Sequence, residues 1–317
     1  MDAVTEWIGE QQTDFNQRLL KDGVLLFRGF PVQSAQDFYR ILALFAAKDE
    51  SLLNYVGGAS PREEVEEKVY TSTEAPPFVT ILQHPEMCYL SDYPTKLGFY
   101  CHIPSETGGQ TPLTDARQLY REMPNDLVDE ITKKQVVYRR ILQRRGRRQK
   151  LLSKLHRAFG VATWNYVYKT DDKALVAQQC ADMNQKIVWN SDESLTTESK
   201  VPAVLTHPVT GDKVWFNTLH NFIHERNMFG NIAGPVVRFL RRITGEKFEI
   251  YFGDGTEIPV QTKQRVKEII DARTWSFDWQ KGDVLIIDNL LYWHGRSPFK
   301  GDRKILAGLI GKVEQNQ

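Results

Sequence analysis

The sequence has few cysteines and no long apolar run. Its three cysteines, Cys88, Cys101 and Cys180, are an odd number without Cys-x-x-Cys spacing, which argues against a disulfide framework and predicts reduced, buried thiols. No stretch approaches the roughly 20 apolar residues that cross a bilayer. The N-terminal segment MDAVTEWIGEQQTDF has neither the basic start nor the apolar core of a signal peptide. These absences favour a cytoplasmic protein.

An excess of one charge is also missing. The chain of 317 residues has 41 Lys and Arg against 40 Asp and Glu, so no overall field favours nucleic acid or a membrane as a partner. Hydrophobic residues make up 41% and charged residues 26%, as is usual for a globular protein that buries its own core. We see no repeat or linker that requires a second domain, and therefore expect residues 1–317 to form one domain.

The order of predicted elements indicates the fold class. Apolar periodicity predicts helices over residues 2–20, 34–49, 115–134 (interrupted at Pro124), 235–243 and 261–272. Strands are predicted over residues 23–30, 78–83, 97–103, 136–142, 203–207, 213–217, 274–279, 284–288 and 304–310. The absence of a β-α-β rhythm disfavours a parallel sheet. We expect a mainly β fold, an antiparallel sandwich or jelly roll with flanking helices and a helical insertion at about 143–200. The irregular segment 54–77 is typical of a lid or binding loop.

Two histidines and one carboxylate form a predicted metal site. His84 ends an apolar strand, and residues two apart in an extended chain point to the same side, so His84 and Glu86 can reach one ion. This pair alone is not specific, because one such match among seven histidines is expected by chance. A second apolar run, followed by NLLYW, leads to His294. Two imidazoles and one carboxylate leave coordination positions open, which is typical of non-haem Fe(II) oxygenases.

Further polar residues suit a co-substrate and a substrate. Arg303 follows His294 by nine residues, and a guanidinium can bind the far carboxylate of a keto acid that chelates iron through its other end. Thr111, after Gly108-Gly109-Gln110, is a candidate to complete that contact. Asn217 could contact the substrate. Arg296 could do so too, or could have a structural partner.

Two other features have competing interpretations. His220 and His224 lie four residues apart beside Glu225, a helical spacing that can bind zinc and would suit a zinc-dependent hydrolase. The segment LHNFIHERN lacks the HExxH motif of zinc proteases, which makes this the weaker alternative. The basic run at 138–150 is either a solvated face or an anion-binding patch.

Three segments together resemble a known family. QHPE, FYCHIPSETGGQTPLTDAR and NLLYWHGRSPFKGDR resemble the taurine dioxygenase and clavaminate synthase-like superfamily, and most closely the SyrP-like hydroxylases of peptide natural-product pathways. The resemblance implies a double-stranded β-helix (a cupin-like jelly roll) and the use of Fe(II), 2-oxoglutarate and O2. It implies that His84, Glu86 and His294 bind the metal, and that Arg303 and Thr111 hold 2-oxoglutarate. Pro85 departs from the Asn that is often found there.

The resemblance also implies a reaction type. Halogenating relatives have Ala or Gly at the carboxylate position, whereas this chain has Glu86. Hydroxylation of a C–H bond is therefore favoured, with desaturation or cyclisation as alternatives. The implied substrate is an amino acid or a derivative of one, free or tethered to an acidic carrier protein that the basic run at 138–150 would contact.

Overall fold

The computed structural model describes residues 1–58, 62–73, 75–144, 146, 163–223, 234–235, 239 and 247–312. Its helices are α1 (Asp2–Glu10), α2 (Gln12–Asp22), α3 (Ala35–Ala43), α4 (Ala116–Glu122), α5 (Asn125–Lys134), α8 (Trp164–Val167), α9 (Lys173–Asp182), α11 (Val260–Ala272) and the 3-10 helix η1 (Leu219–Phe222). Helix α3 begins at a capping box, in which Ser34 and Asp37 each bond to the other's backbone N–H. None of the described helices is long and apolar enough to cross a membrane.

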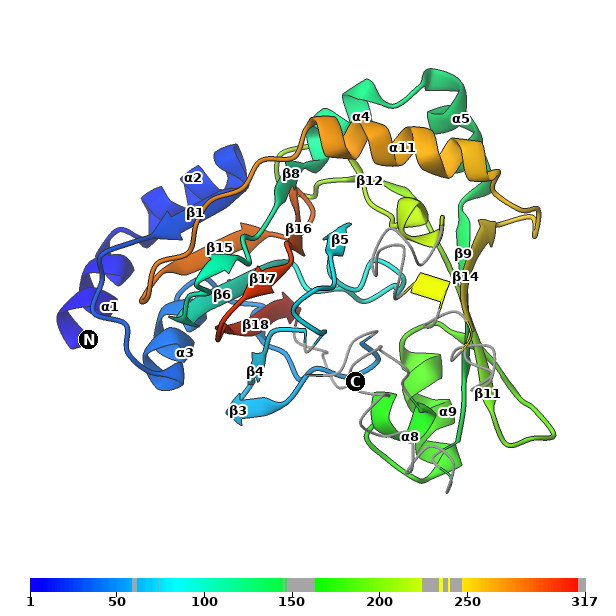
Figure 1. Cartoon of the computed structure of the whole chain (residues 1–317), viewed down its shortest axis with the longest axis horizontal. Helices are drawn as coiled ribbons and strands as arrows, with labels where there is room; N and C mark the ends of the chain where they lie inside the picture. Colours follow the sequence, from blue (N-terminus) through cyan, green and yellow to red (C-terminus); the bar gives the residue numbers. More distant parts are fainter. Residues whose placement is uncertain are drawn as a thin grey trace.

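The largest sheet combines strands from early and late in the sequence. Its strands lie in the order β1 (Val24–Phe27), β15 (Val284–Asp288), β6 (Lys96–Ile103), β18 (Lys304–Lys312), β4 (Val69–Thr71) and β3 (Glu64–Glu66), with β2 (Glu50–Leu52) also paired to β18. Every pairing in it is antiparallel. Figure 1 shows β1 in blue beside β15 in orange, and helices α1 to α3 gathered on this side of the molecule.

Two glycines fit α3 against this sheet. Gly98 and Gly308 are directly paired across β6 and β18. A Cβ atom at Gly98 would lie 2.6 Å from a methyl carbon of Leu42, and one at Gly308 would lie 2.3 Å from the other methyl. Leu42 is fully buried in a core cluster with Phe38 and residues of β6, β15 and β18. The glycines thus allow the helix to approach the sheet closely.

Smaller sheets complete the fold. A three-stranded sheet has the order β5 (Ile81–His84), β16 (Tyr292–Arg296), β8 (Leu113–Asp115), and a four-stranded sheet has the order β10 (Lys186–Trp189), β11 (Leu195–Val201), β9 (Val136–Leu142), β14 (Lys247–Phe252). Strand β12 (Val204–Thr206) forms a hairpin with β13 (Lys213–Trp215), and β17 (Phe299–Lys300) pairs with β7 (Thr107–Gly108), which is distant from it in the sequence. The described chain is a mixed α/β protein with antiparallel sheets, so "mainly β" understated its helices.

Most of the predicted elements are confirmed, including the break at Pro124 and the β12–β13 hairpin. The helix predicted over 2–20 is two helices that meet at Gln11. The strand predicted over 274–279 is wrong, because Trp275 makes only an isolated bridge to Leu113 and is 45% exposed. The helix predicted over 235–243 falls almost wholly outside the described residues. All three cysteines are buried and unpaired, as expected.

The insertion predicted as helical contains strands as well. Helices α8 and α9 lie in it, but β10 and β11 do too, and β11 pairs with β9 along seven residues. A separate core cluster packs the described part of this segment, with Trp164, Tyr168, Val176 and Cys180 among its buried members. The segment therefore extends a sheet. The alternating burial of β11, with every second residue buried, is the period-2 pattern of a strand.

Candidate metal centre

The pairing of β5 with β16 brings the predicted metal ligands together. His294 stands opposite His84 in the sheet register, and their ring centroids are 4.5 Å apart. His294 Nε2 lies 3.6 Å from Glu86 Oε2. One nitrogen or oxygen atom from each of the three side chains lies within 4.8 Å of the others, and no other such group was found among the described residues. These three donors can hold one metal ion.

His84 is oriented as a metal ligand should be. Its Nδ1 lies 2.8 Å from the carbonyl oxygen of Leu82, and since a carbonyl only accepts, Nδ1 carries the hydrogen. Nε2 then keeps its lone pair for a metal. Burial, together with the nearby His294, lowers the pKa of His84 to about 4. The imidazole is therefore neutral near pH 7, which metal binding requires.

Glu86 is fixed at both its backbone and its side chain. Strand β5 ends at His84, so Glu86 lies in the following turn, beyond the extended stretch we expected to hold both ligands. Its backbone N–H donates to Asn289 Oδ1 (2.7 Å), and Asn289 Nδ2 donates to its carbonyl (3.0 Å). Its carboxylate Oε2 accepts from Arg62 Nη2 at 2.7 Å. Burial alone would raise the pKa of Glu86, but Arg62 and His294 hold this pKa well below its usual range, so the group is an anion.

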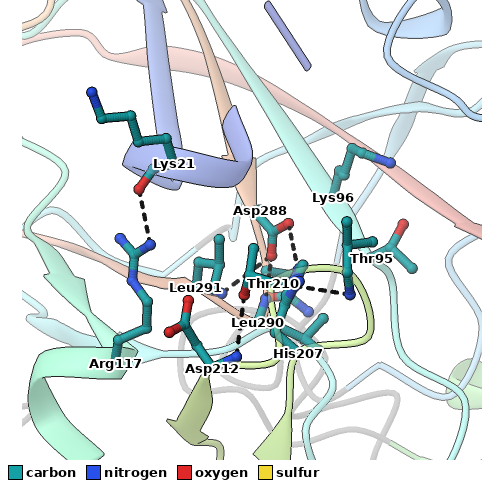
Figure 2. A network of polar contacts seen from close by, with 12 residues as sticks. Lys21, Thr95, Lys96, Arg117, His207, Thr210, Asp212, Asp288, Leu290 and Leu291 are labelled. Carbon is teal, nitrogen blue, oxygen red and sulfur yellow. Dashed lines mark hydrogen bonds and ion pairs between the residues drawn. The ribbon is translucent and has the colours of Figure 1, made fainter. Parts of the chain in front are cut away.

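A buried polar network holds the turn that carries Asn289 (Figure 2). Asp288 Oδ1 accepts from the backbone N–H groups of residues 290 and 291, at 3.0 and 3.2 Å. His207 Nδ1 accepts from the backbone of Thr210, so its Nε2 carries the hydrogen and donates to Asp288 Oδ2 (3.1 Å). The backbone N–H of Asn289 donates to the carbonyl of Thr95 (2.9 Å). The turn between β15 and β16 is thereby tied to β6 and to the β12–β13 hairpin.

Arg303 contacts the segment that carries Thr111, the other residue predicted to hold a co-substrate. Arg303 Nε donates to the carbonyl of Gly109 (3.0 Å). Burial and the positive charge of Arg296 lower the pKa of Arg303 to about 10, so it is still a cation near pH 7. Thr111 is buried, and its Oγ1 accepts from Trp279 Nε1 (3.0 Å) while its own hydrogen can still be donated. None of the ion pairs among the described residues gives Arg303 or Arg296 a carboxylate partner. This arrangement fits a bound carboxylate.

The two residues predicted to contact substrate bond to the main chain. Arg296 donates to the carbonyls of residues 75, 76 and 79 at 2.8, 2.7 and 2.9 Å, which favours the structural alternative. Asn217 is fully buried, donates to the carbonyl of Ala203 (3.0 Å) and accepts from the N–H of Leu219 (3.2 Å). The hydrogen bonds of both side chains therefore go to the protein's own main chain.

The zinc alternative gains no support from the described residues. His220 Nε2 lies 2.8 Å from the carbonyl of Gln83, and its ring stacks on Trp293. Burial lowers the pKa of His220 to about 3. Its predicted partner His224 lies outside the described residues. His220 therefore contacts β5 through the Gln83 carbonyl and β16 through the Trp293 ring.

The described arginines of the basic run have partners of their own. Arg139 pairs with Glu198 (2.6 Å), and Arg144 pairs with Glu193. Arg140 is buried, donates to the carbonyl of Gly57 (3.2 Å) and lies over the Phe248 ring. Residues 145 and 147–150 lie outside the described part.

Sequence reasoning missed Arg62 and Asn289. Asn289 could have been found, because the pair Asp288-Asn289 directly follows the apolar residues 284–287 of a strand that is buried throughout. Arg62 gave no such signal. It lies in segment 54–77, which we predicted to be irregular but which contains β3 and β4, and only the three-dimensional structure brings it to Glu86.

Comparisons with known proteins agree with this geometry. The family model for "Taurine catabolism dioxygenase TauD, TfdA family" matches residues 2–309. A clavaminate synthase-like protein of Arabidopsis thaliana is 31% identical over 309 residues, covering 96% of this chain and 86% of that protein. The dapdiamide synthesis protein DdaC of Enterobacter agglomerans is 30% identical over 295 residues, covering 93% and 84%.

Solved structures show the same fold. A taurine dioxygenase from Burkholderia xenovorans has a TM-score of 0.51 at 16% identity, covering 96% of this chain and 81% of that one. The protein AAD-2, solved with Mn(II) and N-oxalylglycine, has a TM-score of 0.50 at 13% identity, covering 96% and 88%. At these identities the likeness concerns the fold alone.

Proposed function

This chain belongs to the taurine catabolism dioxygenase TauD, TfdA family and is an Fe(II)- and 2-oxoglutarate-dependent dioxygenase, and on that premise we propose that it hydroxylates an unactivated C–H bond of an amino acid or an amino-acid derivative. The observation that carries the proposal is the convergence of His84, Glu86 and His294 within 4.8 Å. When bound, Fe(II) with 2-oxoglutarate and O2 supplies the oxidising power, and the keto acid is converted to succinate and CO2.

The chain's own residues have distinct roles in this proposal. His84, Glu86 and His294 are the metal ligands, and they leave the other coordination positions open for co-substrate and O2. Arg303 binds the far carboxylate of 2-oxoglutarate, and Thr111 donates its hydroxyl hydrogen to the same group. Glu86 and His294 are buried and His84 is partly buried, which limits the access of water to the ligands.

The substrate class and pathway are part of the proposal. The relative DdaC is named for dapdiamide synthesis, which supports a role in natural-product biosynthesis. The SyrP-like branch is the part of the family to which we assign the chain within this proposal. Desaturation or cyclisation stays the alternative outcome. We take the substrate to be a small molecule, free or delivered by an acidic carrier protein, and the enzyme to work in the cytoplasm.

The proposal also includes a double-stranded β-helix fold and a single domain. The sheet of β1, β15, β6 and β18 and the sheet of β5, β16 and β8 would be the two halves of a double-stranded β-helix, the jelly roll of this family. The family match over residues 2–309 supports a single domain over 1–317.

The test is an anaerobic titration with Fe(II) and 2-oxoglutarate, followed by the visible charge-transfer band of the chelate. Wild-type protein should form the band and, in air, release succinate. Glu86→Ala should lose both, because the metal loses its anionic ligand. Glu50→Ala is the matched control, since Glu50 is a carboxylate paired with a cation (Lys96, 2.6 Å) outside the metal site. Undiminished turnover in Glu86→Ala would remove Glu86 from the site.

A further inference from the structure

Arg62 is a buried cation at the metal site whose hydrogen-bonding capacity is mostly unused. A guanidinium has five N–H groups, and Arg62 donates through Nη2 to Glu86. Its Nε and Nη1 atoms are buried and have no hydrogen-bond partner among the described residues. The side chain is only 3% exposed, so water does not satisfy these donors in the way it would at the surface.

We propose that Arg62 binds a carboxylate group of the substrate, beside the metal ligands. This inference rests on the proposed function and adds the chemical class of the substrate. Nη2 carries two hydrogens, and only one is needed for Glu86. The other can act together with a hydrogen on Nε or Nη1 to bind a second carboxylate through two parallel bonds. Arg62 would then bridge Glu86 and the substrate.

The position of the guanidinium is fixed in advance. Its central carbon lies 4.6 Å from the centroid of the Tyr55 ring, which covers one face. The backbone carbonyl of Arg62 accepts from the hydroxyl of Tyr166 (3.3 Å). A cation held by a ring and by Glu86 loses little further freedom when an anion binds, which favours specific recognition.

The charges around the site also favour an anionic substrate. With Fe(II) and 2-oxoglutarate bound, five positive charges (two on the metal and one each on Arg62, Arg296 and Arg303) would face three negative ones (one on Glu86 and two on 2-oxoglutarate). No ion pair among the described residues joins these three arginines to a carboxylate other than Glu86. In a buried site such an excess is costly, and a substrate carboxylate reduces it.

A purely structural role makes a different prediction. If Arg62 only neutralises Glu86, its loss should weaken metal binding, and added carboxylates should have no effect on the site. If Arg62 also receives the substrate, a small carboxylate should bind the Fe(II)–2-oxoglutarate form, and a neutral amide of the same shape should not. Propionate and propionamide are such a pair.

The experiment follows the visible band of the anaerobic Fe(II)–2-oxoglutarate complex during titration with each probe. In the wild type, propionate should shift the band saturably, and propionamide should not. In Arg62→Gln the band should still form, but the apparent Kd for propionate should rise at least tenfold, with Arg62→Lys in between. Arg139→Gln, which removes an arginine from a surface ion pair with Glu198, should behave as the wild type.

Each other result has a defined meaning. Absence of the band in the wild type would refute the proposed function itself. A band without a propionate response, or an equal response in Arg62→Gln, would refute the carboxylate site alone. Loss of the propionate response when 2-oxoglutarate is raised tenfold would mean that the probe occupies the co-substrate's position, which also refutes it. Loss of the band in Arg62→Gln would assign Arg62 to metal binding instead.

Discussion

Replacing Asn289 by alanine should weaken both the fold and the metal site. Its side chain is fully buried and makes three bonds to main-chain groups: it accepts from the N–H of Glu86 (2.7 Å) and donates to the carbonyls of Glu86 (3.0 Å) and Pro94 (2.7 Å). Asn289→Ala leaves all three groups without this partner. Each unsatisfied buried group costs about 1–3 kcal/mol, so we expect a loss of about 3 kcal/mol or more in the free energy of unfolding.

The matching fall in Tm follows from chain length. An unfolding entropy of about 2.1 cal/mol/K per residue over 317 residues converts 3 kcal/mol into a decrease of roughly 4–5 °C. The functional effect comes from Glu86, whose backbone is no longer fixed. Loss of a group that orients a metal ligand typically reduces metal affinity about 10–100-fold, and we expect this for Fe(II).

Two measurements and one control separate these effects. Urea unfolding of the metal-free protein gives the stability loss, and anaerobic titration gives the Fe(II) affinity. Asn217→Ala is the control, because Asn217 is equally buried and bonds only to the main chain of Ala203 and Leu219. It should cost about 2 kcal/mol of stability but leave Fe(II) affinity unchanged. Equal loss of Fe(II) affinity in both variants, or none in Asn289→Ala, would refute the reasoning.

Two further predictions concern packing and the co-substrate. Gly308→Ala places a Cβ 2.3 Å from a methyl carbon of buried Leu42 and should lower the free energy of unfolding by about 1–3 kcal/mol. Gly9→Ala, where a Cβ has nothing within 4 Å, should raise the free energy of unfolding by about 0.5–1 kcal/mol. Urea unfolding measures both, and equal effects would contradict the packing of α3. Arg303→Lys keeps the positive charge but loses the two parallel hydrogen bonds to a carboxylate, which are worth about 1.5–3 kcal/mol. The KM for 2-oxoglutarate should therefore rise roughly 10–100-fold in a succinate assay. An unchanged KM would place the co-substrate elsewhere.

The parts of the fold that could be predicted are those with a local signal. Strand β15 is buried at all five positions, and the first four form a continuous apolar run. Helix α4 begins after Asp115, whose carboxylate caps it, and helix α5 begins after Pro124. The three metal ligands were also predictable, since each follows an apolar run and the family resemblance assigned their roles.

What could not be predicted depends on contacts distant in sequence. Strand β16 reads Tyr-Trp-His-Gly-Arg, which has no alternation, and it is a strand because β5 and β8 pair with it on both sides. The run 274–279 has β-forming residues, yet it finds only one bridging partner. Arg62 is a functional candidate only because segment 54–77 passes beside Glu86, and no local pattern reports such a contact.

The register that sets His294 opposite His84 has a consequence for how the protein acquires its metal. The two imidazoles come from paired strands that lie about two hundred residues apart in the sequence. A nascent chain that still lacks β15 and β16 has two of the three donors, and it also lacks Asn289 to orient Glu86. The complete donor set therefore forms only once β16 has paired with β5, and a product that ends before β16 lacks it.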